Sequence, residues 1–213
     1  MTHLVWNCRG LGSDTVVRAL HGLIRKHRPD LIFLAETKMR DHRVDGVRRR
    51  MGYREAFHVS PSGRAGGLSM WWNESVEVTI GFASKHIIDA TVNYVDSNRQ
   101  ARVTWVYGTV YRIEKVEFWR WMREWFKPTN TPWLCGGDFN EILWDHEKSG
   151  GASPNYNRPR YLEEFLNVTE LMDLDYNGPC FTWRGMRNGH LVEERLDRGL
   201  ANKQWQDSWP NTM

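Results

Sequence analysis

The chain has 213 residues, with 29 lysines and arginines against 26 aspartates and glutamates, a formal net charge of +3. This length suits one α/β domain with a substantial core, so we predict a single domain over residues 1–213. No apolar run approaches the length of a membrane span, and the first residues lack a signal-peptide pattern. These features exclude a membrane-spanning protein and lead us to expect a soluble, intracellular one.

The near balance of charges excludes a strongly basic arm, although Arg48, Arg49 and Arg50 would form a local basic face on a solvated helix. Three cysteines are odd in number and lack metal-ligand spacing, so we expect free thiols in a reducing compartment. Twelve tryptophans favour a packed sandwich over a helical bundle.

The first half of the chain reads as strands with one helix. An apolar strand at 3–6 runs directly into Asn7, and Ser13 or Asp14 can cap a helix that Pro29 ends. A second apolar strand, at 31–35, ends in Glu36. After a glycine-rich turn, further strands are predicted at 68–72, 76–80, 87–95 and 101–107.

The second half carries two predicted helices. The first includes Phe118, Met122 and Trp125 at helical spacing, and the second spans roughly 158–172. Between them lie an apolar strand that enters Gly136-Gly137-Asp138-Phe139-Asn140 and a polar loop at 144–157. Strands interrupted by a few helices favour layered sheets flanked by helices over an alternating parallel barrel.

The apolar strand that enters Gly136 delivers two polar side chains to one face. Residues two apart on an extended strand point the same way, so Asp138 and Asn140 would lie side by side. Asp138 is then the candidate to activate or orient an attacking water, and Asn140 the candidate to position it.

Other strands also end in, or carry, polar groups. Asn7 and Glu36 suit a divalent metal of the Mg²⁺ kind, which takes few oxygen ligands and completes its shell with waters and phosphates. Tyr107 could hydrogen-bond the phosphate, and Asp197 could orient a basic partner. Each has a plainer reading: Glu36 as a solvated acid, Tyr107 as a half-buried core residue, and Asp197 as the partner of a neighbouring arginine.

Five segments, taken in order, resemble the endonuclease/exonuclease/phosphatase superfamily, the deoxyribonuclease-I-like group. They are Trp6-Asn7-Cys8-Arg9-Gly10, Leu34-Ala35-Glu36-Thr37-Lys38, Val106-Tyr107-Gly108, Gly137-Asp138-Phe139-Asn140 and Arg195-Leu196-Asp197-Arg198. The opening Trp-Asn-Cys-Arg-Gly-Leu-Gly, the Glu147-Lys148-Ser149-Gly150-Gly151 loop and Phe181-Thr182-Trp183 look most like the endonuclease domain of plant LINE-type (non-LTR) retrotransposons.

The resemblance implies a four-layer α/β sandwich of two mixed β-sheets flanked by helices. It implies cleavage of phosphodiesters with Mg²⁺ or Mn²⁺, with duplex DNA as the partner and the nucleus as the location if the DNA is genomic. By position, Asn7 and Glu36 match the metal-side residues, and Tyr107 matches the phosphate-contacting tyrosine. Asp138 and Asn140 match the pair that activates water and stabilises the transition state, and Asp197 matches the acid near the C-terminus.

The sequence departs from the family pattern at its end. The family closes with a strand carrying Ser-Asp-His, which this sequence does not reach, so we expect a domain that is incomplete at the C-terminus and impaired in catalysis. The pairs Asp41-His42 and Asp145-His146 are expected in loops, and neither substitutes by chain order. Alternatives are an inactive remnant that binds DNA or metal weakly, and a phosphatase or headgroup hydrolase of the same fold. Metal number and oligomeric state stay open, with a monomer as the default.

Overall fold

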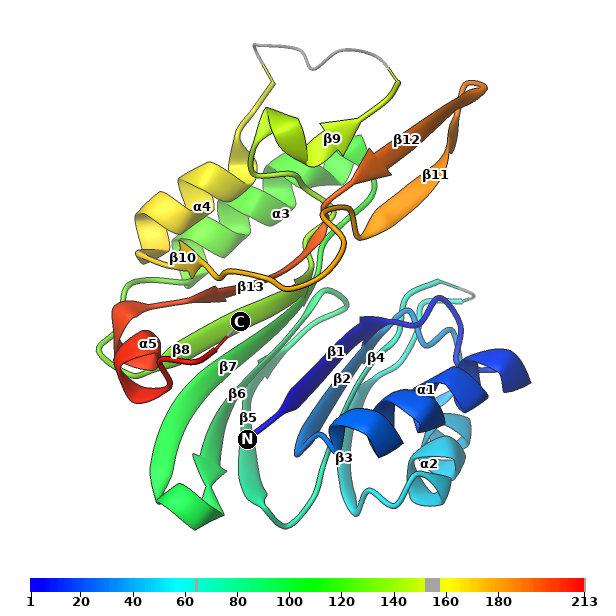
Figure 1. The fold of residues 1–213 in the computed structure, drawn as a ribbon, viewed down its shortest axis with the longest axis vertical. Helices are drawn as coiled ribbons and strands as arrows, with labels where there is room; N and C mark the ends of the chain where they lie inside the picture. The colour runs from blue at the N-terminus through cyan, green and yellow to red at the C-terminus, as the bar shows by residue number, and fades with distance from the viewer. Residues whose placement is uncertain (64, 152–157, 213) are drawn as a thin grey trace. The chain divides into compact units, whose positions relative to one another are not determined.

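The computed structural model describes residues 1–63, 65–151 and 158–212. The chain folds into two compact units, Met1–Tyr107 and Gly108–Met213, which we take in turn (Figure 1). The expectation of one domain over residues 1–213 stays a prediction. Among the described residues, no helix has both the length and the apolar character needed to cross a membrane.

The described residues of the first unit form seven strands and two α-helices. In chain order the elements are β1 (His3–Asn7), α1 (Asp14–His27), β2 (Leu31–Ala35), α2 (Asp41–Arg50), β3 (Glu55–Val59), β4 (Leu68–Trp72), β5 (Val76–Ala83), β6 (Ile87–Tyr94), the 3-10 turn η1 (Val95–Ser97) and β7 (Arg99–Tyr107). Strands β1, β2, β4 and β3 form a mixed sheet, in which β1 and β2 are parallel. Strands β5, β6 and β7 form an antiparallel meander.

Strand β2 is the centre of this unit, because all five of its residues are buried. Ile32 and Leu34 belong to the cluster that includes Leu20 of α1 and Val44 of α2. Phe33 points the other way and stacks on Trp105 of β7, with ring centroids 6.0 Å apart. A strand covered on both faces reads as a continuous apolar run, which is why the sequence identifies it clearly.

The second unit carries the remaining elements. They are α3 (Arg112–Trp125), β8 (Trp133–Asp138), the 3-10 turn η2 (Asp145–Glu147), β9 (Lys148–Ser149), α4 (Tyr161–Thr169), β10 (Met172–Asp173), β11 (Trp183–Arg187), β12 (His190–Glu194), β13 (Asp197–Ala201) and α5 (Lys203–Ser208). Strand β13 pairs antiparallel with β8 and with β10, and β12 pairs with β11 and β9. Helices α3 and α4 pack against each other (Figure 1).

Aromatic side chains fill the core of this second unit. Trp119 of α3 stacks on Phe139 at the end of β8 and on Tyr161 of α4, at centroid distances of 6.3 and 6.4 Å. Phe126 and Trp133 stack at 5.7 Å and are both fully buried. Trp119 and Trp133 therefore serve the core, whereas Trp125 and Trp144 are exposed.

Several sequence-based boundaries are corrected by the structure. The helix predicted over 158–172 spans only Tyr161–Thr169, because Glu170 takes a left-handed conformation (φ 57°) that ends it. Segment 41–50 forms helix α2, so Asp41-His42 lies in a helix, and Asp145-His146 lies in the 3-10 turn η2. The part of the predicted polar loop at 152–157 lies outside the described residues.

Arg48 is also corrected, since it is buried and not part of a solvated face. Its guanidinium donates to Asp45 Oδ1 at 2.7 Å and to the carbonyls of Tyr53 and Arg54 at 2.6 and 2.5 Å. An arginine that satisfies two backbone carbonyls at the end of its own helix can be buried because these hydrogen bonds replace those it would make with water. Arg49 and Arg50 are exposed, as predicted.

One partly buried histidine of the first unit has a lowered pKa. The centroid of the His3 ring lies 5.5 Å from that of Trp105 and 6.0 Å from that of Tyr94. Burial lowers the pKa of His3 to about 4, although the charge of Asp30 acts to raise it. The pKa of this histidine is therefore near 6.5 in the unfolded chain and about 4 in the folded chain, so between these pH values only the unfolded chain binds the proton.

We therefore predict that the unfolding free energy falls as pH is lowered from 6.5 to 4, by at most about 3 kcal/mol from this group. Urea unfolding of His3→Gln across this range should show a smaller pH dependence than wild type. His21→Gln, which replaces an exposed histidine of α1, is the matched control. Equal pH dependence of His3→Gln and wild type would contradict the assignment.

Candidate active site

Parallel pairing of β1 and β2 brings Asn7 and Glu36 together. Asn7 is in register with Ala35, and Cys8 N continues the pairing by donating to Ala35 O at 3.0 Å. Because parallel strands end at the same edge of a sheet, the next residue of β2 lies beside Asn7. Asn7 Nδ2 donates to Glu36 Oε1 at 2.9 Å, so the two predicted metal-side residues form a direct hydrogen bond.

Glu36 is held as a charged carboxylate. Burial by itself raises its pKa, but hydrogen bonds from Lys38, Asn7 and Tyr107 outweigh that effect, and the pKa lies below its ordinary value. Lys38 Nζ lies 2.7 Å from Glu36 Oε2. Glu36 is thus ionised at neutral pH, and Tyr107 reaches it from the end of β7.

The segment 36–38 has an unusual backbone that two glycines support. Glu36 and Lys38 adopt φ of 55° and 50°, a left-handed conformation that is uncommon for residues other than glycine. Thr37 N and Lys38 N donate to the carbonyls of Gly67 and Gly66, each at 3.0 Å. A side chain at Gly67 would collide with the Thr37 hydroxyl, so the glycines of the glycine-rich turn before β4 also serve to hold the segment of Glu36.

In the second unit, strands β8 and β13 carry the other predicted acids. Asp138 ends β8, Asp197 begins β13, and the two lie opposite each other in the antiparallel register. Asp138 is 8% exposed. Like charges directly opposite each other in a sheet repel, so each of these carboxylates depends on its other neighbours for stability.

Asn140 is fixed by hydrogen bonds from three of its polar groups. Its backbone N–H donates to Asp138 Oδ1 at 3.0 Å, its Nδ2 donates to Gly108 O at 2.8 Å, and its carbonyl accepts from Lys115 Nζ at 2.6 Å. Like Glu36, Asn140 is left-handed, with φ of 49°. Phe139, fully buried between the two polar residues, anchors the segment in the core.

A buried ion network joins the loop that follows Asn140 to the strand that carries Asp197. Glu147 Oε2 accepts from Arg198 Nη2 at 2.6 Å and from Leu143 N at 2.6 Å. Arg198 has no exposed side-chain area, and it also pairs with Asp173 at 2.9 Å. Burial raises the pKa of Glu147, but Arg198 and the backbone N–H groups of Leu143 and Trp144 together outweigh this and hold the pKa below its ordinary value.

Comparison with known proteins identifies the family. A sequence model described as the endonuclease/exonuclease/phosphatase family matches residues 4–210. The chain belongs to the endonuclease/exonuclease/phosphatase family. A search of curated proteins gives no match.

Solved structures of low sequence identity share the fold. The AP endonuclease LMAP of Leishmania major is 16% identical, with a TM-score of 0.72 over 95% of this chain and 79% of that one. The 3' phosphatase NExo of Neisseria, solved bound to product DNA hairpin, is 17% identical, with a TM-score of 0.65 over 95% and 87%. The endonuclease domain of TRAS1, a telomere-specific non-LTR retrotransposon, is 14% identical, with a TM-score of 0.63 over 96% and 86%. The predicted fold class, mixed β-sheets flanked by helices in a deoxyribonuclease-I-like arrangement, is confirmed.

The residues of the first unit fit a hard divalent cation. No group of three or more His, Cys, Asp or Glu that could hold a metal occurs in the described part of the chain, so an all-protein metal cage is not indicated there. Mg²⁺ usually takes one or two carboxylates and leaves the rest of its shell to waters and phosphates. Glu36 supplies an ionised carboxylate, whose two oxygens have lone pairs beyond those used by Asn7, Lys38 and Tyr107.

Three further residues belong to these sites and were not expected from the sequence. The ammonium groups of Lys38 and Lys115 contact Glu36 and the Asn140 carbonyl. Glu147 binds Arg198, which follows Asp197 in β13. The helical spacing of the sequence could have placed Lys115 on the buried side of α3, because it lies three residues before Phe118 and seven before Met122. No sequence pattern indicated the role of Glu147, because its partner, Arg198, is 51 residues away.

Gly108 is a residue against which the Asp138–Asn140 segment packs. A Cβ at residue 108 would lie 2.6 Å from the carbonyl carbon of Phe139 and closer still to its oxygen, so the segment must shift. We expect Gly108→Ala to lower the unfolding free energy by about 1–3 kcal/mol. Gly22→Ala, in open space on α1, is the control and should be neutral or stabilising by about 1 kcal/mol. Equal stability of the two variants in chemical denaturation would contradict the packing argument.

Glu147 is the main carboxylate partner of the buried Arg198. Glu147→Gln leaves the buried Arg198 guanidinium with a single carboxylate partner, so we expect a loss of about 3–5 kcal/mol in unfolding free energy. The matched control is Glu117→Gln, which breaks an exposed pair with Arg120 and should change stability by less than about 1 kcal/mol. Calorimetry measures both changes. If Glu147→Gln lowered the unfolding free energy as little as the control does, the ion network would not be what stabilises this part of the fold.

Proposed function

We propose that this chain is a divalent-metal-dependent phosphodiester hydrolase that acts on DNA, an endonuclease domain of retrotransposon type. The observation that carries the proposal is the ionised Glu36 hydrogen-bonded to Asn7 at 2.9 Å, in a chain that belongs to the endonuclease/exonuclease/phosphatase family. DNA as the substrate is supported by relatives of the same fold: the AP endonuclease, the 3' phosphatase solved with a DNA hairpin, and the TRAS1 endonuclease domain.

Glu36 and Asn7 would hold the cation, which supplies Lewis-acid polarisation of the phosphoryl oxygen when bound. Tyr107 hydrogen-bonds Glu36, and in doing so it helps to keep the carboxylate charged. The tyrosine thereby acts on the carboxylate that would bind the cation, in addition to the phosphate contact that the family pattern implies.

Asp138 would accept the proton of the attacking water or orient that water. Its Oδ1 already accepts the Asn140 N–H, which fixes the carboxylate. Asn140 Oδ1 makes no hydrogen bond among the described residues, so it can accept one from water or substrate. Asp197, opposite Asp138, would orient a basic group near the scissile phosphate.

A plasmid-nicking assay tests the proposal. Purified protein should convert supercoiled plasmid to the nicked form with Mg²⁺ or Mn²⁺ and not with EDTA. Glu36→Ala and Asp138→Ala should each lower the rate by about 10²-fold or more, because each removes a group that acts in the transition state. Asp96→Ala, which removes an exposed carboxylate in η1, is the control and should nick at the wild-type rate.

The double variant shows whether the two sets of residues serve one reaction. Groups that act as a unit are strongly non-additive, so Glu36→Ala/Asp138→Ala should lose little more than the worse single variant. Fully multiplicative losses would contradict a joint role. Release of phosphate from a 3'-phosphorylated oligonucleotide without any nicking would replace the endonuclease with a phosphatase, and metal-independent nicking would overturn the proposal.

A further inference from the structure

The first turn of α3 and the residues before it hold the Asn140 segment from two sides. Gly108 N donates to Asp138 O at 2.7 Å, while Gly108 O accepts from Asn140 Nδ2 at 2.8 Å. Seven residues later, Lys115 Nζ donates to Asn140 O at 2.6 Å. The short piece of chain from Gly108 to Lys115 therefore contacts both the side chain and the backbone of Asn140.

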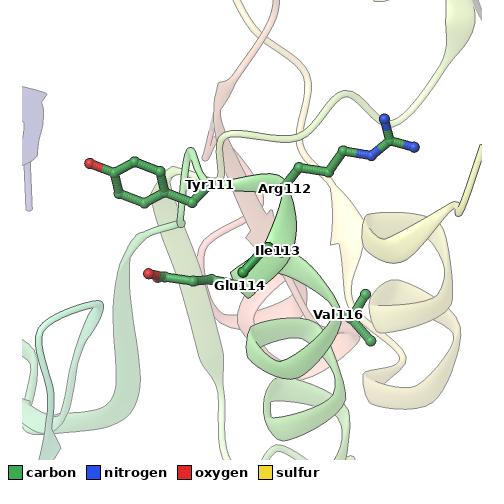
Figure 2. Close-up of a pocket in the computed structure, with 5 residues that line it drawn as sticks. All are labelled: Tyr111, Arg112, Ile113, Glu114 and Val116. Carbon is green, nitrogen blue, oxygen red and sulfur yellow. The ribbon is translucent and has the colours of Figure 1, made fainter.

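This piece of chain is itself braced by a local hydrogen-bond network. The hydroxyl of Thr109, a buried residue, donates to Glu114 Oε2 and accepts from Tyr111 N, each at 3.2 Å. Figure 2 shows this turn, with Tyr111 and Glu114 extending to the same side and the guanidinium of Arg112 extending away from the helix. The spacing between Gly108 and Lys115 is thus set by a hydrogen-bonded turn and not by a loose loop.

Lys115 differs from an ordinary surface lysine. The side chain of Lys115 is 20% exposed, whereas Ile113 in the same turn is 92% exposed, so the lysine is the residue that turns inward. Its ammonium also pairs with Glu141 Oε2 at 2.9 Å, and Glu141 is only 11% exposed. Ordering a lysine side chain loses conformational entropy, and two short charge-assisted contacts at one ammonium offset that loss.

We propose that Lys115 is a positioning residue, whose hydrogen bond to the Asn140 carbonyl holds Asn140 in its left-handed conformation and so aims its amide at the substrate. The inference rests on the proposed function, which gives Asn140 its task. A left-handed asparagine has an extended alternative of comparable energy. Rotation of the Asn140 backbone would turn its carbonyl from Lys115 and break the Nδ2 hydrogen bond to Gly108, so the lysine selects the conformation in which both contacts are made.

The test compares Lys115→Met, which keeps the stem and removes the ammonium, with Lys115→Arg, which keeps the charge. Lys127→Met is the matched control, because Lys127 Nζ also donates to a backbone carbonyl, that of Arg123 at 2.7 Å, but at the other end of α3. In Mg²⁺-dependent nicking we expect Lys115→Met to lower kcat roughly tenfold to a hundredfold with KM nearly unchanged. Lys115→Arg should recover most of the loss, and Lys127→Met should match wild type.

A second readout does not depend on activity. The side-chain amide signals of Asn140 in a ¹⁵N correlation spectrum are those that disappear in Asn140→Ser. They should shift or broaden in Lys115→Met and stay in place in Lys127→Met. If Lys115→Met does not fold, Glu141→Gln, which weakens the hold on the ammonium, should move the same signals.

The two readouts separate the failure of this inference from the failure of the proposed function. Unmoved Asn140 signals in a folded Lys115→Met protein, or a wild-type kcat in that variant, would overturn the positioning role. If wild type does not cleave DNA while the Asn140 signals move as expected, the lysine still positions Asn140, and the proposed hydrolase activity is the statement that fails.

Discussion

Buried strands that end in a polar residue are the constraint on which both units are built. Strands β2 and β8 are buried along their whole length, so neither can place a charge inside without a partner. Each therefore delivers its polar group only at its last position or the residue just beyond, Asp138 in β8 and Glu36 after β2. The same burial that forbids charges along the strand fixes the strand end rigidly, and rigid support is what a reacting carboxylate needs.

Backbone strain gathers where these strands end. Of the eight described residues other than glycine with positive φ, four lie in segments that carry predicted site residues: Arg9, Glu36, Lys38 and Asn140. Such conformations raise the energy of the folded state by roughly 1–3 kcal/mol each when nothing local favours them, so they persist only where the surroundings impose them. The hydrogen bonds that impose these conformations are present in the structure. Gly66 and Gly67 accept from the backbone of residues 36–38, and Gly108 and Lys115 bind Asn140. The strain and its supports are thus parts of one arrangement.

The sequence predicted the strands better than the connections between their ends. Strand β2 was readable because a run buried on both faces is apolar throughout, and Glu36 stood out as the residue that breaks the run. The hydrogen bond between Asn7 and Glu36 follows from the parallel pairing of β1 and β2, which was not predicted from the sequence. The roles expected for Asn7, Glu36, Tyr107, Asp138, Asn140 and Asp197 stay predictions that activity measurements must decide.

What the sequence could not show depends on partners outside the element that carries the residue. Arg48 is one of three consecutive arginines, and it can be buried because its guanidinium binds the carbonyls of Tyr53 and Arg54, beyond the end of α2, as well as Asp45. Glu147 sits in a polar loop like many surface acids, and it becomes structural because Arg198 lies behind it with no exposed side-chain area. Composition and periodicity describe one element at a time, so they cannot identify a charge whose neutralising partner comes from another element.

Two lysines take different roles around the predicted site residues. Lys38 pairs with Glu36 directly, at 2.7 Å, so a cation bound there would have to share the carboxylate with it, and that competition would weaken metal binding. Lys115 instead directs its charge to the Asn140 carbonyl and to Glu141, and not to the Asp138 carboxylate. A cation placed on Asp138 would lower its basicity and hinder proton acceptance, whereas one placed on a backbone carbonyl orders the segment without that penalty. The direction in which Lys115 points is therefore as important to the proposed chemistry as its charge.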